Sequence, residues 1–203
     1  MARNGNAKPR SKPSIDSTRR VFDGFLKLDE VTVSFDRIGG PGRIEGHKRL
    51  VLERGDSAAA ILHDIDTDEV LLTEQVRVAT IVKGPGVIRE VVAGSIETGE
   101  APELCMIREI EEEIGYRVRK SALKRIGMFY VSPGGTSERI VLFYARVKAS
   151  QRVNAEATGL ASEGEDIALV RIKREAFVRQ ALSGKIDDAK TLIAGLWLAN
   201  QGK

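Results

Sequence analysis

The stretch from Gly94 to Tyr116 reads GSIETGEAPELCMIREIEEEIGY, and it decides how the rest of the chain is interpreted. Pro102 suits the first turn of a helix, and Gly115 suits a left-handed helix end. The apolar residues between them recur at helical spacing, so we expect a helix from about Pro102 to Ile114. A loop that begins with a glycine therefore leads into a helix rich in glutamate.

The glutamates of this helix are expected to share one face. If Arg108 is set at zero, then at ~100° per residue Glu112 falls at ~40°, Glu109 at ~100° and Glu113 at ~140°. The isoleucines fall on the opposite side, where they can pack against a sheet. Crowded carboxylates near the negative end of the helix dipole repel one another unless cations bind. The alternatives are a solvated acidic face and a site for divalent cations that prefer oxygen ligands.

Composition narrows the class of protein. The 203 residues include one cysteine, Cys105, which excludes an internal disulfide and fits a cytoplasmic location. There is no apolar run long enough to span a membrane, so we expect no membrane association. The first twenty residues are rich in arginine and lysine but lack interleaved aromatics, so we interpret them as a solvated tail rather than a nucleic-acid-binding arm.

Apolar patterning predicts a mixed sheet flanked by helices, preceded by a small antiparallel sheet. We expect residues 1–18 to form a disordered basic tail, residues 19–56 to form N-terminal antiparallel strands, and residues 57–203 to form the main domain. Order is expected to begin near Val21. Strands are predicted at about 31–35, 47–53, 58–62, 69–81 (one strand or a pair), 87–92, 123–131, 138–147 and 167–172, with further helices at about 174–182 and 188–200.

The acidic stretch also resembles a known family motif. It matches every fixed position of the Nudix box, G-x5-E-x7-R-E-U-x-E-E-x-G-U. The matching residues are Gly94, Glu100, Arg108, Glu109, Ile110, Glu112, Glu113, Gly115 and Tyr116. The resemblance implies an α/β/α sandwich with a mixed β-sheet, a bound Mg²⁺ or Mn²⁺ ion, and hydrolysis of a nucleoside diphosphate linked to another group.

Segments outside the box resemble the ADP-ribose pyrophosphatase branch of that family, among them SPGGTSE at residues 132–138. This likeness implies hydrolysis of ADP-ribose to AMP and ribose 5-phosphate by a homodimer that exchanges N-terminal strands. A sister branch that acts on GDP-mannose shares the proline-glycine loop and a GxIxDAKT-like ending, so another nucleotide sugar is the alternative. A nucleotide-binding regulatory module and an RNA-end hydrolase are the alternatives of other classes.

The resemblance also implies roles for individual residues. The expected metal ligands are the backbone carbonyl of Ala93 and the carboxylates of Glu109, Glu112, Glu113 and Glu165. The expected general base is Glu163, with Glu112 and Glu113 as the other candidates. The expected substrate contacts are Arg49, Arg77, Glu90, Pro133, Gly134 and Glu138, with Arg49 reaching the partner subunit. The residues expected to shape the motif are Gly94, Glu100, Arg108 and Gly115.

Overall fold

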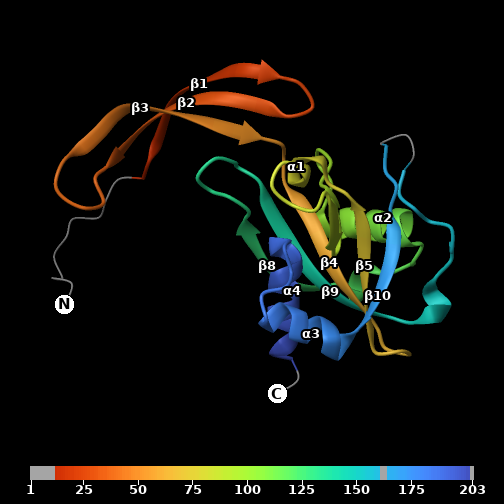
Figure 1. Ribbon diagram of the computed structural model, residues 1–203. Coiled ribbons are helices and arrows are strands. Elements are labelled where there is room, and N and C mark those ends of the chain that lie inside the picture. The colour runs from red at the N-terminus through yellow and green to blue at the C-terminus, as the bar shows by residue number, and fades with distance from the viewer. Residues whose placement is uncertain (1–11, 161–163, 202–203) are drawn as a thin grey trace, which may run out of the picture. The chain divides into compact units, whose positions relative to one another are not determined.

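A computed structural model describes residues 12–160 and 164–201, which divide into two units (Figure 1). The first unit comprises the chain up to Arg54 together with Ser132–Glu138, and the second comprises Gly55–Val131 and the chain from Arg139 onward. The expected boundary at residues 56 and 57 therefore lies close to this division, but the proline-glycine loop falls in the first unit. In the described part of the chain, no helix has the length and apolar content needed to cross a bilayer.

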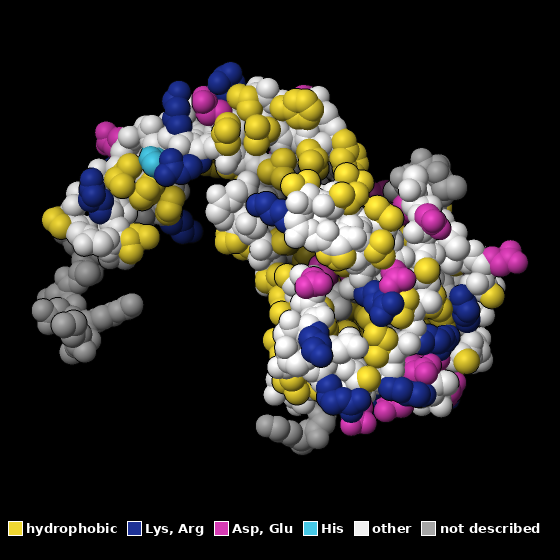
Figure 2. Space-filling model, viewed as in Figure 1, with side chains coloured by type: hydrophobic (Ala, Val, Ile, Leu, Met, Phe, Trp, Pro, Cys, Tyr) yellow, Lys and Arg dark blue, Asp and Glu magenta, His cyan; other side chains and the backbone are white. Residues whose placement is uncertain are grey.

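The first unit is built on an antiparallel sheet of β1 (Ser14–Asp23), β2 (Lys27–Asp36) and β3 (Arg43–Glu53), in that order. The expected turn between β2 and β3 is present and contains Gly42 with φ of 98°. Hydrophobic side chains lie on the visible surface of this unit in Figure 2. Exposed examples are Phe22, Phe25, Ile38 and Leu50.

Strand β1 begins at Ser14, inside the segment 1–18 that was expected to be a tail and before Val21. Its charged residues pair across to β2. Arg19 binds Glu30 at 3.3 Å, and Arg20 binds Asp29 at 2.5 Å. Opposite charges facing each other across two strands stabilise the pairing. A polar sequence that resembled a tail is therefore suited to a strand whose partner carries the complementary charges.

The second unit contains the larger sheet. In the described residues it has seven strands, with the order β10-β5-β4-β9-β8, while β6 pairs with β5 and β7 pairs with β4. The pairing of β4 with β9 is parallel and the others are antiparallel. The strands are β4 (Ser57–Asp64), β5 (Glu69–Val76), β6 (Val87–Glu90), β7 (Val92–Ser95), β8 (Lys124–Tyr130), β9 (Arg139–Val147) and β10 (Ala168–Lys173). The helices are α1 (Val78–Ile81), α2 (Pro102–Ile114), η1 (Lys120–Ala122), η2 (Ala149–Gln151), α3 (Arg174–Leu182) and α4 (Ala189–Ala199).

Helices cover both faces of this sheet, which confirms the α/β/α sandwich (Figure 1). Alternate residues of β4 point to opposite faces, as the two-residue period of a strand requires. Ala58, Ala60 and Leu62 pack in the cluster that includes the isoleucines of α2, whereas Ala59 and Ile61 pack in the cluster that includes residues of α3 and α4. The buried strand β4 therefore lies between two apolar layers.

One expected strand is shorter than the sequence suggested. Residues 69–81 were interpreted as a strand or a strand pair, but β5 ends at Val76 and residues Val78–Ile81 form the short helix α1. The side chains of Val78 and Val82 are exposed rather than packed in a sheet. Apolar content without burial misled the interpretation here, because a short apolar run does not distinguish a strand from a helical turn.

Candidate active site

Strand β7 and the end of helix α2 each contain a glycine where a side chain would collide with a neighbouring group. A methyl group built on Gly94 would lie 1.9 Å from Oε1 and 2.0 Å from Cδ of Glu109. No side chain fits in that space, so a glycine at position 94 allows the Glu109 carboxylate to lie against the strand. Gly115, with φ of 72°, ends α2, and a methyl group on it would lie 1.7 Å from the carbonyl oxygen of Asn154. These contacts give a physical reason for both glycines.

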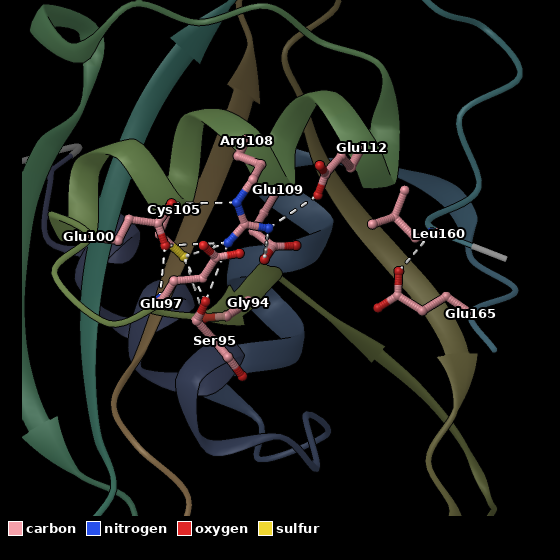
Figure 3. A network of polar contacts seen from close by, with 10 residues as sticks. All are labelled: Gly94, Ser95, Glu97, Glu100, Cys105, Arg108, Glu109, Glu112, Leu160 and Glu165. Carbon is pink, nitrogen blue, oxygen red and sulfur yellow. Dashed lines mark hydrogen bonds and ion pairs between the residues drawn. The ribbon is translucent and has the colours of Figure 1, made fainter. Parts of the chain in front are cut away.

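Arg108 is the centre of a hydrogen-bond network on α2 (Figure 3). Its guanidinium donates to Glu109 Oε1 at 2.7 Å and to Glu112 Oε2 at 3.2 Å, and it also donates to Glu100 at 3.4 Å. Glu100 in turn accepts a hydrogen bond from the backbone N–H of Glu97 at 3.0 Å, which closes the loop ahead of the helix. Burial by itself would lower the pKa of Arg108, but the hydrogen bonds and charges of Glu100 and Glu109 together raise it, so the guanidinium stays charged. Arg108 thus links the loop to the acidic face.

Burial separates the glutamates of α2 from one another. Glu113 is 2% exposed and Glu109 is 8% exposed, although both carry carboxylates. Burial raises the pKa of Glu109, and the charge of Arg108 opposes that shift. Glu111 instead lies at the surface and binds Arg117 at 2.6 Å, which lowers its pKa.

Glu113 is the least compensated of these groups. Its Oε2 is buried and has no hydrogen-bond partner among the described residues. Burial raises its pKa well above the ordinary value, and the negative charges of Glu109, Glu165 and Glu90 raise it further, while Arg77 lowers it. A buried carboxylate without a partner is costly, and such groups are usually paired or bound to a metal. The site therefore has a buried oxygen for which no described residue supplies a donor.

The loop after β9 brings a further carboxylate to this face. The backbone N–H of Gly159 donates to the carbonyl of Glu112 at 3.2 Å, which fastens the loop to α2. Glu165 Oε2 accepts a hydrogen bond from the N–H of Leu160 at 2.9 Å (Figure 3). Its charge acts on both Glu109 and Glu113. Glu163, the expected general base, lies outside the described residues.

The structure also brings Arg77 and Glu90 to the acidic group. Glu90 is 3% exposed, and Nε of Arg77 donates to its Oε1 at 2.6 Å. Lys190 Nζ binds the other oxygen of the same carboxylate. No role was predicted for Lys190, because it lies in α4, 100 positions from Glu90 along the chain. The GxIxDAKT-like ending was the only signal that pointed to this part of the chain.

The remaining expected site residues are distributed between the two units. Ala93 lies in β7 of the second unit, paired with Ala59 and directly before Gly94. Four expected substrate contacts belong to the first unit, namely Arg49, Pro133, Gly134 and Glu138. Within that unit Glu138 is buried and lies 3.6 Å from Arg54, measured between Oε1 and Nε.

The donor set fits a hard divalent cation. The side chains expected to bind it are all carboxylates, and Glu113 supplies a buried oxygen that no described residue contacts by a hydrogen bond. Among the described residues, however, no three acidic, histidine or cysteine side chains are gathered into a ready-made metal cluster. Instead, the carboxylates of Glu109 and Glu112 accept hydrogen bonds from Arg108. The residues present therefore suit Mg²⁺ or Mn²⁺, provided that these carboxylates turn from Arg108 toward the ion.

Cys105 lies on the same helix but has the features of a packing residue. Its side chain is fully buried, and its sulfur lies 3.4 Å from the carbonyl oxygen of Ser95. Burial, together with the charges of Glu109 and Glu100, raises the pKa of Cys105 to about 12. Since the thiolate is the reactive form, this cysteine is a poor nucleophile.

Comparison with known proteins indicates the family to which this site belongs. Residues 53–192 match the family model described as NUDIX domain. The chain is 35% identical over 193 residues to the GDP-mannose pyrophosphatase of Enterobacter sp. (strain 638), an alignment that covers 94% of this chain and 97% of that protein. It is 36% identical over 175 residues to the GDP-mannose pyrophosphatase of Cronobacter sakazakii, covering 85% of this chain and 87% of that protein.

Proposed function

The chain belongs to the Nudix family, and on this premise we propose that it is a divalent-metal-dependent pyrophosphatase of nucleotide sugars. The observation that carries the proposal is the pair of buried carboxylates on α2, Glu109 and Glu113, the second with an oxygen that has no hydrogen-bond partner among the described residues. A regulatory module that only binds a nucleotide would not need such a costly arrangement. A catalytic metal site would, because the ion repays the cost of burying the charges.

Within this proposal, the residues of the site have distinct tasks. Glu109, Glu112, Glu113 and Glu165, with the carbonyl of Ala93, would hold Mg²⁺ or Mn²⁺. Such ions lower the pKa of an attacking water and stabilise the departing phosphate when they are bound.

The protein itself supplies positive charge and a base. Arg77 would bind the diphosphate through its planar guanidinium. A general base from the loop after Gly159, with Glu163 as first choice and Glu112 or Glu113 as alternatives, would take the proton from water.

For the substrate, we infer that GDP-mannose is preferred over ADP-ribose. The resemblance of the loops favoured ADP-ribose, but the relatives that align over most of the chain are named as GDP-mannose pyrophosphatases. The GxIxDAKT-like ending is common to both branches, so it does not discriminate between the two substrates. The products expected from GDP-mannose are GMP and mannose 1-phosphate.

We also propose a homodimer that forms through the sheet of β1, β2 and β3. On this sheet Ile15 is 70% exposed, Phe22 is 59% exposed and Leu50 is 55% exposed. Exposed apolar side chains on one sheet are typical of an interaction surface. Arg49 lies on β3 of the same sheet, so a partner subunit is the route by which it would reach a substrate. Size-exclusion chromatography with light scattering tests the dimer, and a monomer at micromolar concentration would contradict it.

A substrate panel tests the activity. GDP-mannose, ADP-ribose and other nucleotide sugars are incubated with Mg²⁺, and the products are identified by chromatography. We expect cleavage of the pyrophosphate bond, with the highest kcat/KM for GDP-mannose. Preference for ADP-ribose would overturn the substrate and leave the reaction class intact. Absence of cleavage of any nucleotide sugar, with either Mg²⁺ or Mn²⁺, would refute the proposed function.

A further inference from the structure

Two segments of the second unit carry positive charges and no negative ones. Residues 116–131 and 139–153 contain neither aspartate nor glutamate, although the whole chain has 32 lysines and arginines against 29 aspartates and glutamates. Positive charge is therefore concentrated in these segments, in a chain whose charges are otherwise nearly balanced. Its carriers are Arg117, Arg119, Lys120, Lys124, Arg125, Arg139, Arg146, Lys148 and Arg152.

The fold places these two segments side by side. Strand β8 pairs with β9 in antiparallel register, with Lys124 opposite Tyr144. The segments also meet before β8, where the N–H of Arg117 donates to the carbonyl of Gln151 at 2.9 Å. Strand β8 is the last strand in the order of the larger sheet, so the first segment lies along a sheet edge (Figure 1). We call the two segments together the basic ribbon.

Carboxylates neutralise only part of the basic ribbon. Glutamates of α2 bind Arg117 at 2.6 Å and Lys120 at 3.8 Å. Arg139 binds Asp56 at 2.5 Å. The remaining cations that are exposed form no ion pair among the described residues, and they are Arg119, Lys124, Arg125, Arg146 and Lys148.

The free end of the ribbon lies away from the candidate active site. Strand β7, which carries Ala93, pairs with Ser57–Ala60 in the first half of β4. Arg146 instead lies beside His63, near the other end of β4. A ligand bound around Arg146 therefore does not occupy the acidic site on α2.

The surface of the ribbon suits a phosphate backbone better than a lipid bilayer. Between Arg117 and Arg125, the exposed positions other than the cations are Ser121 and Ala122. Binding at a membrane surface usually combines basic residues with large apolar side chains that insert into the lipid, and this end has none exposed. At the other end of β8, Tyr130 is 54% exposed, and an exposed aromatic ring can stack on an unpaired base.

We propose that the basic ribbon binds the phosphodiester backbone of single-stranded nucleic acid. Like charges on neighbouring strands repel one another, and a polyanion that contacts several of them at once removes this repulsion and releases its own counterions. The contacts are to phosphates, so binding does not depend on the base sequence. This binding is separate from the proposed hydrolysis and does not rest on it.

Fluorescence anisotropy with a labelled oligouridine tests the proposal in the full-length protein. Each phosphate contact on a single strand adds about 0.7 to the slope of log Kd against log salt concentration, so contact with all of the exposed unpaired cations predicts a slope of roughly 3.5. Oligothymidine should bind with similar affinity, because it has the same phosphate backbone. Absence of binding at low salt would refute the proposal, as would a strong preference for one of the two oligonucleotides.

Removal of charge locates the binding surface. The double variant Arg119→Gln with Arg125→Gln should raise Kd for oligouridine and lower the salt slope by about 1.4. Lys185→Gln is the matched control, because Lys185 is an exposed cation between α3 and α4, outside the ribbon. It should leave Kd and the slope unchanged. Both variants should keep the wild-type Tm, since none of these side chains is buried.

Two results would assign the positive charge to another role. Unchanged oligouridine binding in the double variant would transfer the binding to the basic residues at the start of the chain and overturn the proposal. Binding to phosphatidylserine vesicles that is lost in the double variant, without any binding of oligouridine, would make the ribbon a membrane surface and overturn it equally. The proposed hydrolysis fails separately, because a wild-type protein that binds oligouridine and cleaves no nucleotide sugar refutes only the hydrolysis.

Discussion

Glu113→Gln should make the metal-free protein more stable while it abolishes the metal response. Oε2 of Glu113 is buried without a hydrogen-bond partner among the described residues, and the neighbouring charges are mostly negative. Glutamine keeps the shape of the side chain but removes the charge. We therefore expect substitution of this proposed metal ligand to increase the free energy of unfolding in the presence of a chelator.

The magnitude follows from the cost of the unpartnered oxygen. An unsatisfied buried polar group costs about 1–3 kcal/mol, and a charged group costs more. For a domain of this size each kcal/mol changes Tm by roughly 2–4 °C. Glu113→Gln should therefore raise Tm by several degrees in EDTA at neutral pH. Saturation with Mg²⁺ should make the wild-type protein the more stable of the two. Binding at 100 times Kd adds about 2.7 kcal/mol to the free energy of unfolding, and only the wild type is expected to bind the ion.

The pH dependence of the difference has a definite sign. The pKa of Glu113 is raised in the folded protein, so the unfolded chain loses this proton at a lower pH than the folded chain does. Stability of the metal-free wild type therefore falls as pH rises from the ordinary glutamate pKa to the raised one. Below that window the carboxyl is protonated in both states, and the stabilising effect of Glu113→Gln should shrink.

Differential scanning fluorimetry with EDTA or Mg²⁺ between pH 4.5 and pH 9 measures this, and Glu111→Gln is the matched control. Glu111 lies on the same helix but pairs with Arg117 at the surface. Its substitution should change Tm little and leave the Mg²⁺ response intact. A lower Tm for Glu113→Gln than for wild type in EDTA at pH 8, or equal Mg²⁺ responses in the two proteins, would refute the reasoning.

Three further predictions concern the glycines and the cysteine. Gly94→Ala should displace the carboxylate of Glu109 and weaken Mg²⁺ binding at least 10-fold by calorimetry, whereas Gly127→Ala, where a methyl group meets nothing within 4 Å, should not; equal affinities in both variants would contradict this. Gly115→Ala should destabilise the fold by more than about 3 kcal/mol in urea unfolding, because it combines a left-handed conformation with a backbone clash; a cost below 1 kcal/mol would contradict the clash. Cys105 should resist a thiol reagent in the folded protein at pH 8 and react once urea is added, so rapid labelling without urea would refute its burial.

Local features of the sequence predicted much of the fold. Helix α2 has the expected bounds, Pro102–Ile114, because its proline start, its glycine stop and its isoleucine stripe all lie within one short segment. Helix α3 also has its expected bounds, Arg174–Leu182. Strand β1 and helix α1 were missed. Strand β1 forms because β2 carries the complementary charges, and α1 is distinguished from a strand by the exposure of its valines. Neither the partner's charges nor the exposure of a side chain can be inferred from a local pattern.

Of the candidate site, the sequence predicted the members but not their differences. The helical period placed Glu109, Glu112 and Glu113 on one face, and it separated Glu111 from them. It did not distinguish the half-buried Glu112 from the nearly inaccessible Glu113. Arg117, which follows the helix end at Gly115, binds Glu111 rather than a member of that face.

By itself, the sequence determined the reaction class, because the Nudix box is a contiguous segment whose spacing already specifies a loop, a helix and a carboxylate face. The tertiary structure decided which of those carboxylates has a buried oxygen without a partner among the described residues, and which cations lie near it. The ion pair between Glu90 and Lys190 joins residues 100 positions apart. Such a pair exists only because α4 packs beside the strand segment around Glu90, and no periodicity within either segment specifies that packing.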